Sequence, residues 1–146
     1  MKILVSSCLL GCKCRYDGND NRIEAIIDLE KKYELIPVCP EELGGLPTPR
    51  VPAEIVDGQV LTRDGEDVTI EFQRGAQLAL EAALSAGCEM AILKERSPSC
   101  GSGLIYDGTF SKVLVPGDGV TAKRLKNAGI RVFGESQAGD LSNIGK

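Results

Sequence analysis

The chain has 146 residues, 42% hydrophobic and 26% charged, which is typical of one globular domain. Its formal charge of −4 argues against nucleic-acid binding, and no apolar run approaches the roughly 20 residues that span a bilayer. Histidine is absent, which excludes histidine-assisted hydrolases and histidine-ligated metal sites. Six cysteines remain as the natural soft ligands, and we expect them to be free thiols in a cytoplasmic protein.

The first half of the chain predicts two strands, one helix and one hairpin. A buried strand over Lys2–Ser6 leads into an irregular stretch, and a helical pattern follows over 21–32. Glu34–Val38 is a second strand, with Pro37 indicating its end or a sheet edge. The proline- and glycine-rich segment 39–52 predicts a shaped loop without a regular element. A hairpin is expected from Ala53–Val56 and Gln59–Thr62 around Asp57-Gly58.

The second half begins with a long helix, capped by Asp67 or Thr69 and running to about Ala86, with Gly87 as its C′ residue. Met90–Leu93 is a third buried strand. A second small hairpin is predicted from Leu104–Tyr106 and 109–110 around Asp107-Gly108. A short helix over 120–128 and a fourth strand over 130–133 complete the domain.

Apolar strands separated by helices imply right-handed crossovers and a parallel sheet. We therefore predict an α/β fold: a single three-layer, Rossmann- or flavodoxin-like domain with a short, mainly parallel sheet and two small hairpins. The domain is expected to span residues 1–135, and the Gly-, Ser- and Asn-rich segment 136–146 is predicted to be a flexible tail.

Three cysteines follow predicted strands. Cys8 lies two residues after the first strand, Cys39 directly after the second, and Cys100 in the loop after the third. Because loops after parallel strands share one sheet edge, these thiols are expected to converge. Cys12 and Cys14 belong to the first of these loops and can lie nearby.

Cys88 precedes the third strand, so we expect it at the opposite edge as a small buried hydrophobe. Converging thiolates without histidine indicate a soft metal site, although incidental buried thiols are the plain alternative. Structural zinc sites often use CxxC pairs, which the chain lacks. An iron–sulfur cluster held by three cysteines would leave one iron open as a Lewis acid.

Polar residues beside these cysteines are candidates for chemistry. A carboxylate after Cys39 could orient or deprotonate water, and Glu41 and Glu42 are equal candidates from chemistry alone. Ser97 and Ser99 place hydroxyls before Cys100, where hydrogen bonds within a turn are the ordinary alternative.

Three motifs carry a family resemblance: SSCLLGCKCRYDG (6–18), PVCPEELGGLPTPR (37–50) and KERSPSCGSG (94–103). The chain resembles, over all but its tail, a family of short bacterial and archaeal proteins once of unknown function and now associated with thiouracil desulfidases. The resemblance implies a [4Fe–4S] cluster on Cys8, Cys39 and Cys100. Such an exposed cluster is easily lost in air.

The same resemblance implies that Glu41 and Ser97 are catalytic, with Ser99 as the competing serine. The implied reaction is non-redox: an open iron polarises the C–S bond of a thiolated pyrimidine and Glu41 positions or deprotonates the attacking water. Ser97 assists proton movement or holds the ring. The expected partner is a small thiolated nucleobase, with no nucleic acid or membrane; the oligomeric state is not predicted.

Three other functions stay open at this point. A sulfur-transfer enzyme acting on RNA would need a basic face and an SGGxDS-type loop, where this acidic chain has SSCLLG. A non-catalytic iron–sulfur or zinc module would leave Glu41 and Ser97 dispensable. A thiol-redox protein would usually carry CxxC.

Overall fold

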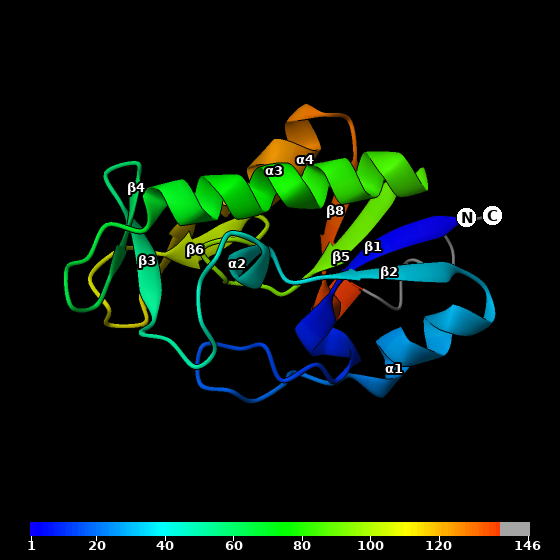
Figure 1. Ribbon diagram of the computed structural model, residues 1–146, viewed down its shortest axis with the longest axis horizontal. Helices are drawn as coiled ribbons and strands as arrows, with labels where there is room; N and C mark the ends of the chain where they lie inside the picture. Colours follow the sequence, from blue (N-terminus) through cyan, green and yellow to red (C-terminus); the bar gives the residue numbers. More distant parts are fainter. Residues whose placement is uncertain (138–146) are drawn as a thin grey trace.

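The computed structural model describes residues 1–137, and a four-stranded parallel sheet in the order β2-β1-β5-β8 lies at its centre (Figure 1). In β1, Ile3 lies opposite Leu35 of β2 on one side and Met90 of β5 on the other. The α/β class and the mainly parallel sheet are therefore confirmed. The strands are β1 (Lys2–Ser6), β2 (Glu34–Val38), β5 (Met90–Leu93) and β8 (Arg131–Gly134).

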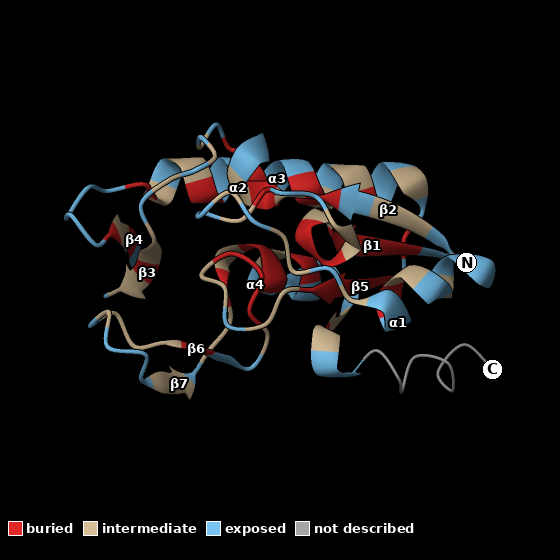
Figure 2. Ribbon diagram, turned by 90° about the horizontal axis from the view of Figure 1, so that it is seen from below, coloured by how far each residue is buried: buried red, intermediate tan, exposed pale blue. Residues whose placement is uncertain are grey.

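Helices cover both faces of this sheet. On one face lie α3 (Thr69–Ala86) and α4 (Val120–Asn127), and on the other lie α1 (Glu24–Ile27) and the 3-10 turns Ser7–Leu10 and Asp28–Lys31 (Figure 1). Leu4 packs in the cluster on the α3 and α4 side, whereas Ile3 and Val5 pack with Leu9 and Ile26 on the opposite side. Figure 2 shows the buried residues gathered in the sheet and on the helix faces turned toward it.

The long helix α3 ends at Gly87 as predicted, but its N-cap is Val68, without a side-chain capping bond, so the predicted cap at Asp67 or Thr69 is wrong. The Oδ1 atom of Asp67 accepts a hydrogen bond of 2.9 Å from the Thr69 amide, and Gly87 ends the helix in the left-handed region at φ 79°. Phe72 is 1% exposed, and burying such a side chain contributes about 1.5–3 kcal/mol. The helix therefore forms one outer layer of the domain.

The prediction that segment 39–52 lacks a regular element is wrong, because residues Pro40–Leu43 form the short helix α2. Pro40 occupies the first turn, where its missing N–H costs nothing. Two glycines then let α2 approach α3 at backbone contact. A Cβ atom would lie 1.9 Å from the Glu71 carbonyl oxygen if built on Gly44, and 1.9 Å from that of Pro40 if built on Gly75.

Two predicted boundaries also needed correction. The pattern over 21–32 gives only α1 and a 3-10 turn, because the chain tightens into i to i+3 bonds such as that from the Lys32 amide to the Leu29 carbonyl. The last strand begins at Arg131 rather than Ile130, whose amide is still bonded to the Leu125 carbonyl at the end of α4.

The first hairpin is confirmed: β3 (Ala53–Val56) pairs with β4 (Gln59–Thr62) around Asp57-Gly58. In the second, β6 (Leu104–Tyr106) pairs with β7 (Leu114–Pro116), so the predicted partner strand 109–110 is wrong. The amides of Gly108 and Phe110 instead donate to Oε1 of Glu54, at 3.0 and 3.1 Å. This buried carboxylate holds the loop 107–113 against β3.

Within residues 1–137, each helix falls short of the length and apolarity that a membrane crossing requires. The sheet edge formed by β2 carries Pro37, as its sequence indicates. Ser136 and Gln137 belong to the 3-10 turn Glu135–Gln137, and the rest of the predicted tail, 138–146, lies outside the described residues. The domain boundary at residue 135 stays a prediction.

Candidate metal centre and active site

A cavity of about 610 Å³ lies at the carboxyl edge of the sheet, where the loops after β1, β2 and β5 meet. Its lining includes Cys8, Cys39 and Cys100, one thiol from each of these loops. The two hairpins supply the facing wall through residues such as Glu54 and Tyr106. Chain topology therefore brings together three cysteines that are distant in sequence.

Cys88, which the sequence predicts to lie apart from the other thiols, does not line this cavity. Its side chain is 6% exposed and packs in the core with Ala83, Leu125 and Ile130. Burial raises the pKa of its thiol, as expected for a small apolar side chain. Cys88 thus belongs to the packing of the domain.

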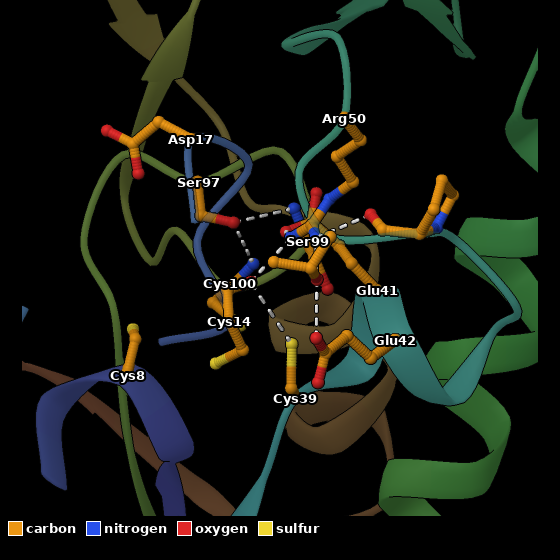
Figure 3. A network of polar contacts seen from close by, with 12 residues as sticks. Cys8, Cys14, Asp17, Cys39, Glu41, Glu42, Arg50, Ser97, Ser99 and Cys100 are labelled. Atoms are coloured by element: carbon orange, nitrogen blue, oxygen red, sulfur yellow. Dashed lines mark hydrogen bonds and ion pairs between the residues drawn. The ribbon is translucent and has the colours of Figure 1, made fainter. Parts of the chain in front are cut away.

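A fourth thiol, Cys14, enters the same cavity and has no counterpart in the ligand set inferred from the sequence. It is 2% exposed, and its thiol hydrogen-bonds with both Cys8 and Cys39. Its carbonyl accepts a bond from Nη2 of Arg50 at 3.0 Å and from Sγ of Cys39 at 3.9 Å. Figure 3 shows Cys8, Cys14 and Cys39 side by side, each from a different segment. The prediction that Cys14 can lie near these thiols, made from its place in the loop after the first strand, is confirmed.

The thiols differ in how readily they ionise. The hydrogen bond with Cys14 lowers the pKa of Cys8 to about 7 against the effect of burial, aided by the Asn21 amide at 3.4 Å and the charge of Lys94. The same Cys14 bond lowers the pKa of Cys39, and the pKa of Cys14 is raised by its bonds to Cys39 and Cys8. The hydrogen bonds with Cys14 therefore favour ionisation of Cys8 and Cys39 over ionisation of Cys14.

Cys100 has the opposite environment. Complete burial raises the pKa of its thiol to about 12, against a weaker lowering by hydrogen bonds with Ser6 and Ser99. A metal cation would offset this penalty, because a coordinating thiol is deprotonated by the charge of the ion.

The structure distinguishes the two adjacent glutamates of α2. Glu41 lines the cavity with the three cysteines, and its Oε2 atom lies 2.8 Å from Nη2 of Arg50. Glu42 does not line that cavity, and its Oε2 atom instead accepts a short hydrogen bond from the Thr48 hydroxyl (Figure 3). Of the two carboxylates, only Glu41 faces the space beside all three thiols.

The two serines before Cys100 also differ. Ser97 lines the cavity, and its hydroxyl oxygen accepts hydrogen bonds of 3.1 Å from the amides of Ser99 and Cys100. Ser99 is 1% exposed, and its hydroxyl lies 2.7 Å from that of Thr121 in α4. Ser99 therefore joins two parts of the fold, whereas Ser97 faces the cavity.

Several cations, among them Lys94, and the aromatic side chains of Tyr16, Tyr106 and Phe110 also belong to the lining. Lys94 is held by Oε1 of Glu135 at 3.0 Å, and its charge acts on Cys8. Tyr106 and Phe110, from the second hairpin and its loop, line the same cavity as the thiols. Sequence reasoning missed this aromatic wall, because the loop that carries Phe110 is held by a glutamate 56 residues away.

This arrangement can hold a soft metal group and act on a planar ligand. Three thiols from three loops are the donor set that iron–sulfur clusters use, and a chain without histidine offers no competing imidazole. A carboxylate and a hydroxyl lie in the same cavity, available to water or a ligand. The residues present therefore fit a thiolate-bound cluster with an accessible side.

Comparisons with known proteins agree with this chemistry. The family profile for 2-thiouracil desulfurase matches residues 3–137. The uncharacterized protein YbbK of Bacillus subtilis (strain 168) is 46% identical over 149 residues, covering 95% of this chain and 99% of that protein. A solved structure of the [4Fe-4S]-dependent thiouracil desulfidase TudS is similar at a TM-score of 0.93 and 48% identity, covering 98% of this chain and 96% of that one.

Proposed function

Because the chain belongs to the 2-thiouracil desulfurase family, we propose that it is an enzyme that converts thiouracil and water to uracil and hydrogen sulfide. The observation that carries this proposal is one cavity that holds three strand-end thiols, a carboxylate and a hydroxyl. No oxidant or reductant is needed, since sulfur leaves at the oxidation state in which it arrives.

The cofactor is a [4Fe–4S] cluster, as in the similar desulfidase structure. Cys8, Cys39 and Cys100 are the proposed ligands, because each follows a different strand and all three line the cavity. When bound by three cysteines, the cluster supplies an iron without a protein ligand, a Lewis acid for the substrate sulfur.

Glu41 is the proposed base. Its carboxylate faces the cavity, and the Arg50 guanidinium fixes its orientation at 2.8 Å. There it can hold a water molecule and take its proton as the water attacks the ring carbon. Ser97 is proposed to hold the ring or move a proton to it, because its hydroxyl faces the same space.

The remaining walls suit a planar ligand with polar edges, because aromatic side chains and cations such as Arg96 and Lys112 line them. Tyr106 and Phe110 offer aromatic faces on which a pyrimidine ring can pack, and Lys94 provides a cation near the thiolates. The proposed partner is therefore a small thiolated nucleobase. The acidic charge of −4 supports the absence of a nucleic-acid partner, and six free thiols support a cytoplasmic location.

The test is anaerobic reconstitution followed by iron and sulfide counts, an absorption spectrum and sulfide release from 2- and 4-thiouracil. Each of Cys8→Ser, Cys39→Ser and Cys100→Ser should lower iron content and abolish turnover. Cys88→Ala serves as the control away from the cavity. A fully active protein without iron, or a cluster-loaded protein that releases no sulfide from either substrate, would contradict the proposal.

A further inference from the structure

A second group of metal-binding atoms lies beside the three-thiol set. The sulfurs of Cys12 and Cys14 and a carboxylate oxygen of Glu42 all lie within 4.8 Å of one another. We propose that these residues form a separate site for one soft or borderline divalent cation of the Zn²⁺ class. The site uses none of the three cysteines proposed to hold the cluster, and its Cys14 thiol contacts two of them.

The donors suit such an ion. Thiolate and carboxylate are established zinc ligands, with Zn–S and Zn–O distances of about 2.3 and 2.0–2.2 Å, and three protein ligands leave a fourth position for water. They come from two segments: the C-x-C of the loop after β1 and the Glu42 position of α2. An ion bound there would join two segments that the backbone does not connect directly.

Hydrogen bonds hold both halves of this site in place. Arg50 donates from Nη2 to the Cys14 carbonyl at 3.0 Å and from Nη1 to the Thr48 hydroxyl at 2.9 Å. Thr48 in turn donates to Oε2 of Glu42. Such outer partners orient metal ligands and strengthen binding, so the donors are held close together before an ion arrives.

The site is open to solution on one side and meets the cluster cavity on the other. Cys12 and Glu42 are exposed, whereas Cys14 is buried and hydrogen-bonds with Cys8 and Cys39. Cys14 is thus the boundary between an accessible ion site and the enclosed three-thiol set. An ion can reach the outer site without passing through the cavity.

The experiment uses reduced, metal-free protein carrying Cys8→Ser, Cys39→Ser and Cys100→Ser together, which removes all three proposed cluster ligands, including the two thiols that contact Cys14, and leaves the proposed donors intact. Titration with Co²⁺ should give one bound ion with sulfur-to-cobalt charge-transfer absorption. Adding Cys12→Ser or Cys14→Ser should weaken Co²⁺ binding by at least about tenfold, the loss seen even for outer-shell partners, and reduce that absorption. Glu42→Gln should weaken binding while keeping the sulfur absorption.

Glu81→Gln, which changes an exposed carboxylate on α3 away from Arg50, is the control for Glu42→Gln and should bind Co²⁺ as the parent does. Cys88→Ala controls for the number of thiols. Circular dichroism checks that each variant folds. If Cys14→Ser does not fold, Cys12→Ser still tests the proposal, because Cys12 is exposed. The proposal is overturned if the protein without Cys8, Cys39 and Cys100 binds no Co²⁺, or if Cys12→Ser in that protein leaves affinity and absorption unchanged.

Discussion

Arg50 holds Glu41 from a position that has little contact with water. Nη2 of Arg50 lies 2.8 Å from Oε2 of Glu41, and the two side chains are 6% and 21% exposed. The same guanidinium also bonds to the Cys14 carbonyl and the Thr48 hydroxyl. One buried cation therefore fixes the proposed base relative to the thiol-bearing loop.

Arg50→Gln should destabilise the apoprotein, because it leaves a partly buried carboxylate without its cation. Removing one partner of a buried pair costs about 3–5 kcal/mol, and the residual exposure of Glu41 places this pair near about 2–3 kcal/mol. The double variant with Glu41→Gln should cost less than the sum of the single changes. Urea unfolding of all three proteins measures this coupling.

The exposed Lys2–Glu34 pair is the matched control for that cycle. Its side chains are 46% and 63% exposed at a distance of 3.6 Å, so its coupling should be close to zero. Additive effects at Arg50 and Glu41 would show that the two residues stabilise the fold independently.

Glu41→Gln should slow sulfide release by about 10²–10⁴, the usual loss when a general base is removed. The amide keeps the shape of the side chain, so iron content per protein should match that of the unmodified enzyme. Glu81→Gln, on the exposed face of α3, should leave both quantities unchanged. A Glu41→Gln enzyme with normal turnover would eliminate the proposed role.

The two serines should separate activity from stability. Ser99→Ala leaves the Thr121 hydroxyl without its Ser99 partner in a buried region, so unfolding free energy should fall by about 1–3 kcal/mol. It also removes a hydrogen bond to the Cys100 thiol, so turnover is compared per bound cluster and should persist. Ser97→Ala should lower turnover, because its hydroxyl is the one that lines the cavity. Equal loss of turnover in both variants would refute this division.

Much of this site could be predicted from the sequence, because strands and their ends are local features of the chain. Short apolar runs located β1, β2 and β5, and the residues that follow them placed Cys8, Cys39 and Cys100 at one edge. Sequence chemistry alone left Glu41 and Glu42 equivalent. The structure separates them, since adjacent residues on a helix point about 100° apart.

What local patterns could not predict depends on contacts between distant residues. Glu54 bonds to amides 54 and 56 positions later, and this contact replaces the strand pairing expected after Gly108. Likewise α2 exists because Gly44 and Gly75 allow two helices to touch, although glycine and proline near Pro40 read as loop signals. Neither partner can be read from a periodic pattern in its own segment.

The Glu54 contact gives a prediction about the cavity wall. Glu54→Ala removes the acceptor of the Gly108 and Phe110 amides, at 3.0 and 3.1 Å, so both should exchange with solvent deuterium faster. The KM for thiouracil should rise, because Phe110 is then less well held in the wall. Amide exchange of Ala83, in the core, is the internal reference and should not change. Unchanged exchange at both loop amides would show that the loop is held by other contacts.

Gly75→Ala tests whether the approach of α2 to α3 positions the carboxylate of Glu41, the proposed base. Helix propensity alone favours alanine over glycine by about 1 kcal/mol. The new Cβ, however, would lie 1.9 Å from the Pro40 carbonyl oxygen, and a backbone atom cannot rotate away as a side chain can. Overpacking of this kind costs about 1–3 kcal/mol, so the variant should be less stable and α2 should move with Glu41.

Urea unfolding should detect the loss of stability, and reduced sulfide release by cluster-loaded protein should detect the movement of Glu41. Ser85→Ala, exposed on the same helix, carries the favourable propensity without the clash and should stabilise the protein slightly. A Gly75→Ala protein as stable and active as Ser85→Ala would mean that α2 can retreat without disturbing the site.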